Sequence, residues 1–266
     1  MYTYRGSTTL VTGASRGLGT AYATELARRG SDLVLVARSA AALDELAARL
    51  RTAHGVAVRT LAADLTDRTQ VAGLLTDLAD TPVDLLLNNA GMGPAGPFLE
   101  RPLEPNQVAV DLNITALMTL SHALGRTMAA RGHGGIVNVA STAAFQPMPY
   151  QAGYGATKAF VLSFTEALAE ELRGTGVHVM AAHPGGTDTS FFDGTTHTMD
   201  PRHVDAPADV VRRTLDDFAR GRSASYPGRR LNQIGSWAAR FLPRTTTTRL
   251  AAWVNRSVGM DAVRAE

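Results

Sequence analysis

The chain has 266 residues, of which 45% are hydrophobic and 19% charged, a balance that suits a globular fold and argues against disorder. It has no cysteine, which excludes disulfides and thiolate metal sites, and its net charge of +2 is too small to indicate a nucleic-acid partner. The first residues lack a signal-peptide pattern and no run approaches the ~20 apolar residues of a membrane span, so we expect a soluble, cytoplasmic protein.

The first third of the chain alternates short apolar segments with helical patterns. The segment at 32–37 reads Asp-Leu-Val-Leu-Val-Ala, a nearly continuous apolar run that is typical of a parallel strand buried on both faces. We expect strands at 8–12, 32–37, 56–61 and 83–87, with helices at 15–29, 40–52 and 69–79 between them.

The alternation continues beyond a loop rich in glycine and proline at 91–105. We expect a long helix that ends near Arg131, a strand at 135–140, a helix at 154–173 and a strand at 177–182. Regular β-α alternation predicts a doubly wound parallel sheet with helices on both faces, a three-layer α/β/α architecture. We see no linker or repeat, and therefore expect a single domain over residues 1–266.

Two later segments break this rhythm. The stretch at about 186–207 is rich in Thr, Asp and Gly, and we expect it to be a substrate loop. The tail at about 220–266 carries eight arginines and no acidic residue up to Arg256, mixed with Trp237, Phe241 and Trp253. Part of it is expected to form an amphipathic helix. It could cover the substrate pocket, contact another subunit or touch an anionic membrane, and we rank the membrane below the other two.

A glycine-rich turn joins the first strand to the first helix. Gly13, Gly17 and Gly19 allow a tight turn, close approach of a pyrophosphate and close packing of the helix. The new helix directs its free N–H groups and the positive end of its dipole at the same place. Because the turn lies within a β-α-β pattern, it predicts dinucleotide binding.

The G-x-x-x-G-x-G spacing resembles the short-chain dehydrogenase/reductase family, and further motifs of that family follow in order over roughly residues 6–190. Asp64-Leu65 follows the third strand, Asn88-Asn89-Ala90-Gly91 the fourth and Pro184-Gly185 the sixth. The resemblance implies a Rossmann fold, although Thr187 departs from the family's usual valine or isoleucine. The cofactor contacts that it implies are Gly13, Ser15, Arg16, Gly17, Leu18, Gly19, Arg38, Asp64, Leu65, Asn89, Ala90, Gly91, Tyr154, Lys158, Pro184, Gly185, Thr187 and Thr189.

Four polar residues form the expected catalytic set. Tyr154 and Lys158 are four residues apart in an expected helix, so they share one face, where the ammonium lowers the pKa of the phenol. Ser141 ends the fifth strand, at the edge of the sheet that faces the ligand crevice, and can polarise a substrate carbonyl. Asn113 is assigned by the resemblance, which implies that it holds a water linking the lysine to solvent.

The residue after the second strand decides the expected cofactor. An acidic residue there would bind the ribose hydroxyls of NAD, but the chain has Arg38. Its guanidinium can bind a 2′-phosphate and stack on adenine, and Arg16 can approach the same phosphate. Together with the resemblance, these two arginines predict NADP(H).

The expected protein is an NADP(H)-dependent oxidoreductase that transfers a hydride between nicotinamide and a carbonyl or secondary alcohol. Phe145, Met148, Phe191 and Phe192 favour an apolar small-molecule substrate such as a ketone, a steroid or an acyl chain. The histidines show no metal-ligand spacing, so no metal site is expected. The resemblance also implies that the helices at about 106–131 and 154–173 pair across subunits, giving a homodimer or homotetramer.

Two other functions are weighed against this one. A non-catalytic NADP(H)-binding regulator would not need the complete set of Ser141, Tyr154 and Lys158. A sugar-nucleotide epimerase or dehydratase usually has a longer C-terminal substrate region than this chain offers.

Overall fold

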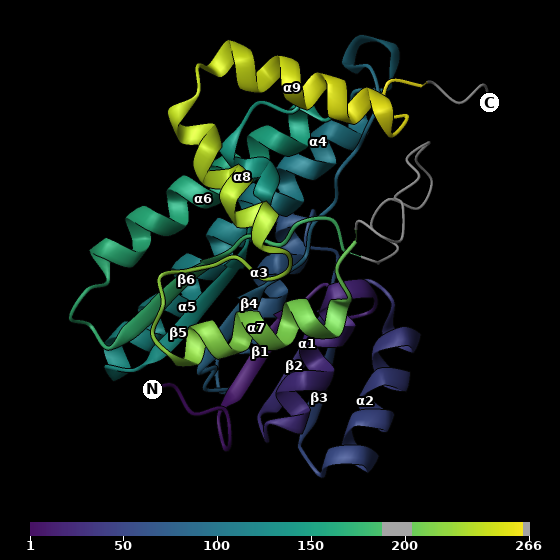
Figure 1. Cartoon of the computed structure of the whole chain (residues 1–266). Helices are drawn as coiled ribbons and strands as arrows, with labels where there is room; N and C mark the ends of the chain where they lie inside the picture. Colours follow the sequence, from purple (N-terminus) through teal and green to yellow (C-terminus); the bar gives the residue numbers. More distant parts are fainter. Residues whose placement is uncertain (188–203, 263–266) are drawn as a thin grey trace.

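The computed structural model describes residues 1–187 and 204–262, and its centre is one sheet of seven parallel strands (Figure 1). The strand order β3-β2-β1-β4-β5-β6-β7 reverses direction between β1 and β4, which is the doubly wound arrangement expected from the sequence. The strands are β1 Thr8–Thr12, β2 Asp32–Ala37, β3 Val58–Ala62, β4 Leu85–Asn88, β5 Gly134–Val139, β6 Val177–Ala182 and β7 Ala224–Ser225.

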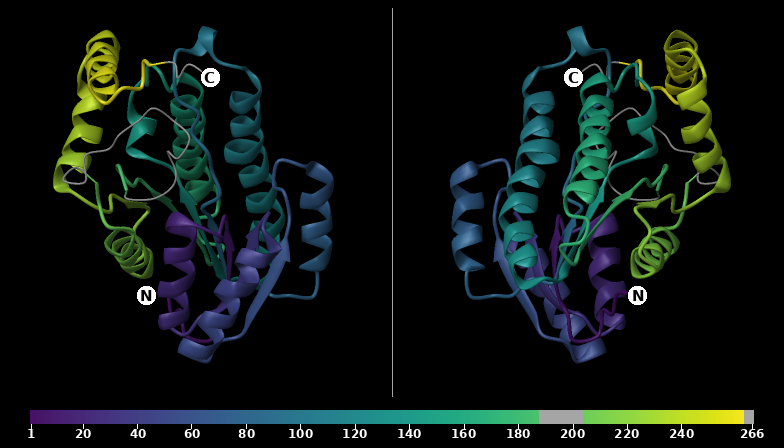
Figure 2. Two further views of the ribbon diagram at one scale, coloured as in Figure 1. Left: turned by 90° about the vertical axis from the view of Figure 1, so that its right-hand side faces the viewer. Right: turned by 90° about the vertical axis from the view of Figure 1, so that its left-hand side faces the viewer.

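Helices cover both faces of the sheet and complete three layers (Figure 2). One face packs against α1 Gly17–Arg28, α2 Ala40–His54 and α7 Pro207–Ala219, and the other against α3 Arg68–Asp77, α5 Leu117–Arg131 and α6 Ala152–Glu171.

Side chains of the central strands alternate between the two cores, which explains their continuous apolar runs. Leu33 and Leu35 pack with the helices of the first face, while Val34 and Val36 pack with those of the second. This is the two-residue period of a strand that is buried on both sides.

Local sequence sets several helix ends. Ser39 caps α2 by accepting a hydrogen bond from the Ala42 N–H at 3.3 Å, and Gly55 ends that helix in the left-handed conformation. The carboxylate of Asp67 caps α3 by accepting from the Thr69 N–H at 2.8 Å.

The long helix expected to end near Arg131 is interrupted. It consists of α4 Glu104–Val110, a π-helical turn at Asp111–Ala116 (η2) and α5. A single π turn between two α-helices is too short to show a side-chain period of its own, so the sequence did not predict it. Glu104–Arg131 is long and apolar enough by composition to cross a membrane, but Leu120 and Met128 within it belong to the core against the sheet.

The C-terminal region forms more structure than expected. After β7 the chain makes two helices, α8 Arg230–Phe241 and α9 Arg244–Ser257, which lie at the carboxyl end of the sheet near α4 and α6 (Figure 1). At the ends of the expected substrate loop, Thr187 forms a parallel bridge with Asp205. The rest of that loop lies outside the described residues.

Candidate active site

A cavity of about 660 Å³ lies at the carboxyl ends of the strands, where the sheet reverses its order. Asn113 does not line it but contacts residues of its wall, and Thr189 lies outside the described residues. The other expected site residues all line it: Gly13, Ser15, Arg16, Gly17, Leu18, Gly19, Arg38, Asp64, Leu65, Asn89, Ala90, Gly91, Ser141, Tyr154, Lys158, Pro184, Gly185 and Thr187.

The glycine turn forms one wall, and its backbone leaves no room for side chains. A Cβ on Gly19 would lie 2.0 Å from the carbonyl oxygen of Gly13 and 2.8 Å from Nδ2 of Asn89. Gly13 itself has a φ of +66°, and a Cβ there would lie 2.9 Å from Cα of Ala90. The turn therefore requires glycine at both positions.

The N-terminus of α1 opens onto this wall. The helix begins at Gly17, no side chain caps it, and its first turn contains no acidic residue. Its first N–H groups and the positive end of its dipole are thus available to an anion in the cavity.

Hydrogen bonds join the ends of β1 and β4 beneath the turn. The hydroxyl oxygen of Thr12 accepts from the N–H groups of Asn89 and Ala90, both at 3.0 Å, and Asn89 Nδ2 donates to the Thr12 carbonyl at 2.9 Å. The Asn89 side chain thereby holds the backbone of residues 89–91 against the glycine turn.

Two cations line the end of the cavity that lies beyond β1 and β2. Arg16 and Arg38 are exposed and line the wall, and neither forms an ion pair with another residue in 1–187 or 204–262. Asp64 has its carboxylate engaged locally, because it accepts from the N–H of Thr66 at 2.9 Å and from its hydroxyl at 2.8 Å. This end of the cavity can therefore receive a second anionic group.

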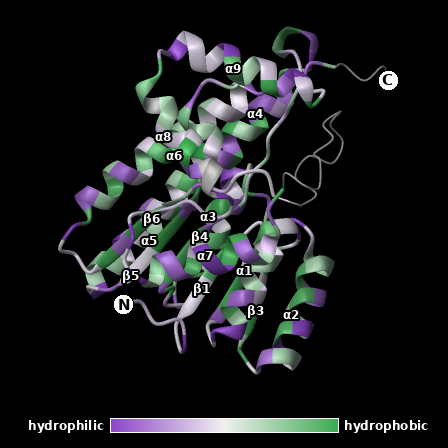
Figure 3. Cartoon of the chain, viewed as in Figure 1, coloured by the Kyte–Doolittle hydropathy of each residue, from purple (hydrophilic) through white to green (hydrophobic). Residues whose placement is uncertain are grey.

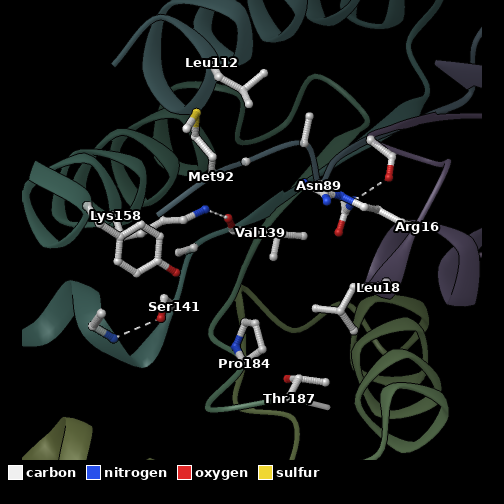
Figure 4. Close-up of a pocket in the computed structure, with 18 of the residues that line it drawn as sticks. Arg16, Leu18, Asn89, Met92, Leu112, Val139, Ser141, Lys158, Pro184 and Thr187 are labelled. Atoms are coloured by element: carbon white, nitrogen blue, oxygen red, sulfur yellow. Dashed lines mark hydrogen bonds between the residues drawn. The ribbon is translucent and has the colours of Figure 1, made fainter. Parts of the chain in front are cut away.

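Lys158 is buried next to Tyr154 on α6. Its Nζ donates a 2.7 Å hydrogen bond to the carbonyl of Val139 (Figure 4) and lies 5.8 Å from the centre of the Tyr154 ring. Burial in this wall lowers the pKa of Lys158 to about 8, because the charged form loses its hydration.

Tyr154 is equally buried, and two effects act on its hydroxyl. Burial raises the pKa of Tyr154, and a side-chain hydrogen bond with Ser141 acts in the opposite direction. The phenol therefore keeps its proton at neutral pH. Ser141 follows β5 in extended conformation, and its Oγ accepts from the Ala143 N–H at 3.1 Å, which leaves its O–H proton to donate elsewhere.

Asn113 lies in the π turn and is fully buried. Its Oδ1 accepts from the Met92 N–H at 3.0 Å, and its Nδ2 donates to the Met92 carbonyl and to the Thr157 hydroxyl, both at 2.9 Å. A Cβ on Gly91 would lie 3.1 Å from Asn113 Oδ1 and 3.5 Å from Lys158 Nζ. The amide thus ties the segment after β4 to α6 beside the lysine.

Several wall residues were not found from the sequence. Gln151 is only 3% exposed, lines the cavity, and has no hydrogen-bond partner for its Nε2 within the described chain. Met260 reaches the same cavity from the C-terminal tail. No sequence signal could have found Met260, because it belongs to no motif and reaches the cavity only through tertiary packing. Apolar lining that was not expected also comes from Met92, Val108 and Leu112.

One of the four bulky residues that favoured an apolar substrate does not reach the cavity. Phe145 does not line the cavity, because its ring packs against His183 and Tyr226 with centroid distances of 4.9 and 5.9 Å. Phe191 and Phe192 lie outside the described residues. Met148 lines the cavity as expected.

Comparisons with known proteins agree with this architecture. Residues 7–200 match the family model described as short chain dehydrogenase. The chain is 36% identical over 209 residues to the ketoacyl reductase HetN of Nostoc sp., covering 78% of this chain and 70% of that protein. A short-chain dehydrogenase from Sphingobium yanoikuyae in complex with NADPH is 36% identical, with a TM-score of 0.81 over 98% of both chains. A bulky-bulky ketone specific alcohol dehydrogenase from Comamonas testosteroni is 33% identical, with a TM-score of 0.78 over 98% of this chain and 96% of that one.

Proposed function

The chain belongs to the short-chain dehydrogenase family, and from this premise we propose that it is an NADP(H)-dependent oxidoreductase acting on a carbonyl or secondary alcohol. The observation that carries the proposal is the pair of Lys158 and Tyr154, buried side by side in the wall of a cavity that a glycine turn also lines. Tyr154 is in turn hydrogen-bonded to Ser141. That arrangement suits proton transfer to a developing alkoxide.

The cavity fits a dinucleotide with an extra phosphate. The glycine turn, in which a Cβ at Gly13 or Gly19 would clash with neighbouring atoms, presents bare backbone to the cavity and lets a pyrophosphate approach closely, next to the uncapped N-terminus of α1. Arg38 and Arg16 would hold the 2′-phosphate through charge-assisted hydrogen bonds. When bound, the cofactor supplies the hydride in the reducing direction and accepts it in the oxidising direction.

The chain's own residues handle the substrate oxygen and its proton. Ser141 donates a hydrogen bond to that oxygen and polarises the carbonyl, and the Tyr154 hydroxyl gives up its proton as negative charge develops. The Lys158 ammonium stabilises the phenolate that remains. Asn113 holds the backbone beside the lysine, and we propose that it also positions the water that returns a proton from solvent.

An apolar substrate fits the remaining wall. Met92, Leu112, Met148 and Met260 line the cavity and offer a flexible apolar surface, while Gln151 offers one buried donor. The names of the similar proteins, a ketoacyl reductase and a dehydrogenase for bulky ketones, support a carbonyl with bulky or extended substituents. Ketones, steroids and acyl chains belong to this class.

Oxidation of NADPH by a panel of bulky ketones, followed by absorbance, tests the proposal. We expect turnover by the wild type and a loss of 10²- to 10⁴-fold in kcat for Tyr154→Phe, the usual contribution of a general acid. Tyr150→Phe removes a hydroxyl whose described contact is Arg256 at 3.4 Å, and it should keep wild-type turnover. NADPH binding without turnover of any panel member would favour the non-catalytic regulator instead.

We further propose a homodimer or homotetramer in the cytoplasm. The proposed contact pairs the long helices at about 106–131 (α4, η2 and α5) and 154–173 (α6) of one copy with those of another, as the resemblance to the family implies. Light scattering on the purified protein tests this, and a monomer at micromolar concentration would contradict it.

A further inference from the structure

The two C-terminal helices, α8 and α9, follow one another across Leu242 and Pro243, and we call this helix pair the C-terminal hairpin. Several of its large apolar residues are exposed. On α8, Ile234, Trp237 and Phe241 occupy one face at helical spacing, with exposed fractions of 61%, 53% and 88%. On α9, Trp253 is 63% exposed, and Leu250 lies on the same face.

Among the side chains of α8 and α9 that the structure describes, the buried ones are polar. Ser236, Thr247 and Asn255 are between 3% and 6% exposed, although each has a polar side chain. This is the reverse of an ordinary surface helix, which buries its apolar stripe and exposes its polar residues. Large apolar side chains exposed together on one face of a helix mark a site of association.

Polar contacts fix the orientation of the hairpin. Asn255 Nδ2 donates a 2.7 Å hydrogen bond to the carbonyl of Pro149, and Arg256 Nη1 lies 3.4 Å from the hydroxyl of Tyr150. Met260, just after α9, lines the active-site cavity. These contacts hold the buried polar side chains against the rest of the molecule, and the exposed apolar side chains stay outward. The two helices lie at the carboxyl end of the sheet (Figure 1), where the cavity also lies.

The charge on the hairpin is entirely positive. No acidic residue occurs between Arg220 and Arg256, and the exposed Arg244 and Arg249 form no ion pair with residues that the structure describes. Figure 3 shows hydrophobic and hydrophilic residues interspersed along α9, at the edge of the molecule. A second copy packed symmetrically on this face would oppose arginine with arginine, which disfavours self-association there.

The segment around η1 (Phe98–Glu100) reaches the same end of the molecule as α9 in Figures 1 and 2. It too exposes apolar side chains, with Leu99 93% and Phe98 49% exposed. The apolar surface at this end thus extends beyond the C-terminal hairpin.

We propose that the C-terminal hairpin docks the protein onto an anionic membrane surface. Tryptophan and phenylalanine side chains favour the headgroup layer, and arginines beside them bind lipid phosphates. Trp237, Phe241 and Trp253 insert into that layer, while Arg244 and Arg249 contact the headgroups. The two helices then lie in the plane of the membrane surface. This brings the cavity close to the lipid, from which an apolar substrate can enter.

Intrinsic fluorescence reports on this surface directly, because the two tryptophans of the chain are Trp237 and Trp253. The full-length protein is titrated with vesicles of phosphatidylcholine containing 30% phosphatidylglycerol, and with vesicles of phosphatidylcholine alone. We expect a blue shift and co-sedimentation with the anionic vesicles, both lost at high salt, and neither with the neutral ones.

Matched variants separate the apolar and the charged contributions. Trp237→Ser/Trp253→Ser should abolish co-sedimentation, whereas Trp237→Phe/Trp253→Phe should retain it. Arg249→Glu should weaken binding at least about five-fold, the effect of one basic residue at an anionic surface. Arg68→Glu, at the start of α3 and exposed, should leave it unchanged. All four variants should keep wild-type turnover of a water-soluble ketone.

Two outcomes would overturn the proposal. One is an unshifted emission spectrum and no co-sedimentation of the wild type with anionic vesicles. The other is a change of oligomeric state in the serine double variant without any vesicle binding by the wild type, which would make this face a subunit interface. Loss of catalysis with intact vesicle binding would instead contradict only the proposed function.

Discussion

Replacing Lys158 with methionine tests the electrostatics of the site through protein stability instead of turnover. The pKa of Lys158 is lowered from the ordinary 10.5 to about 8 by burial. Unfolding in the window between these two values therefore takes up a proton, because the unfolded chain holds one that the folded protein has lost. It follows that the stability of the wild type rises with pH across the window and that this gain is lost as the pH falls through 8.

The size of the effect follows from the shift. Each pKa unit corresponds to about 1.4 kcal/mol, and integration from pH 7 to pH 10 gives a relative gain of about 2.5 kcal/mol for the wild type. For a chain of this length that is roughly 5–10 °C in Tm. Methionine has a similar length and no charge, so Lys158→Met lacks the gain. The substitution also removes the hydrogen bond from Lys158 Nζ to the Val139 carbonyl, and this loss does not depend on pH.

The assay is thermal unfolding of both cofactor-free proteins from pH 7 to pH 10. The background is low, because Lys158 is the only lysine among 26 basic residues and arginine does not titrate in this range. Tyr2, Tyr4 and Tyr22 have raised pKa values, and their ionisation is common to both proteins. A difference in Tm that stays constant from pH 7 to pH 10 would refute the description of Lys158 as a buried, desolvated amine.

Three further substitutions test other parts of the site. Gly19→Ala should lower NADPH affinity at least about 100-fold in calorimetric titration and reduce Tm in thermal unfolding, since its Cβ would lie 2.0 Å from the Gly13 carbonyl oxygen. The control Gly73→Ala adds a Cβ with nothing within 4 Å and should lower neither the affinity nor Tm. Arg38→Ala should raise KM for NADPH about 10- to 100-fold, the value of a charge-assisted hydrogen bond, and leave KM for NADH nearly unchanged, whereas equal effects on both would contradict the assigned 2′-phosphate contact. Gln151→Leu should raise KM for ketones with a polar substituent without lowering Tm, because it removes a buried donor that has no partner within the described chain. Reduced stability with unchanged KM would show that Gln151 is a structural residue.

Most of the fold could be predicted because the signals are local. The apolar runs at 8–12, 32–37 and 177–182 are strands with the same bounds, and the alternation of strands and helices leads to the doubly wound sheet. β7 was not predicted, since two residues are too short to show a period, and Ala224–Ser225 is a strand only through pairing with β6. The π turn at Asp111–Ala116 was missed for the same reason, because hydrogen bonding alone distinguishes it from an α-helix.

Sequence by itself determined the chemistry of the wall. The glycine spacing at 13, 17 and 19 and the four-residue spacing of Tyr154 and Lys158 are short-range patterns whose geometry follows from one turn of backbone. Only the tertiary structure decided what surrounds them. The burial that lowers the pKa of Lys158, the arrival of Met260 at the cavity and the outward apolar face of the C-terminal hairpin all depend on contacts between segments far apart in the chain. Desolvation and packing are properties of the assembled neighbourhood, and a local pattern cannot reveal which side of a helix that neighbourhood will cover.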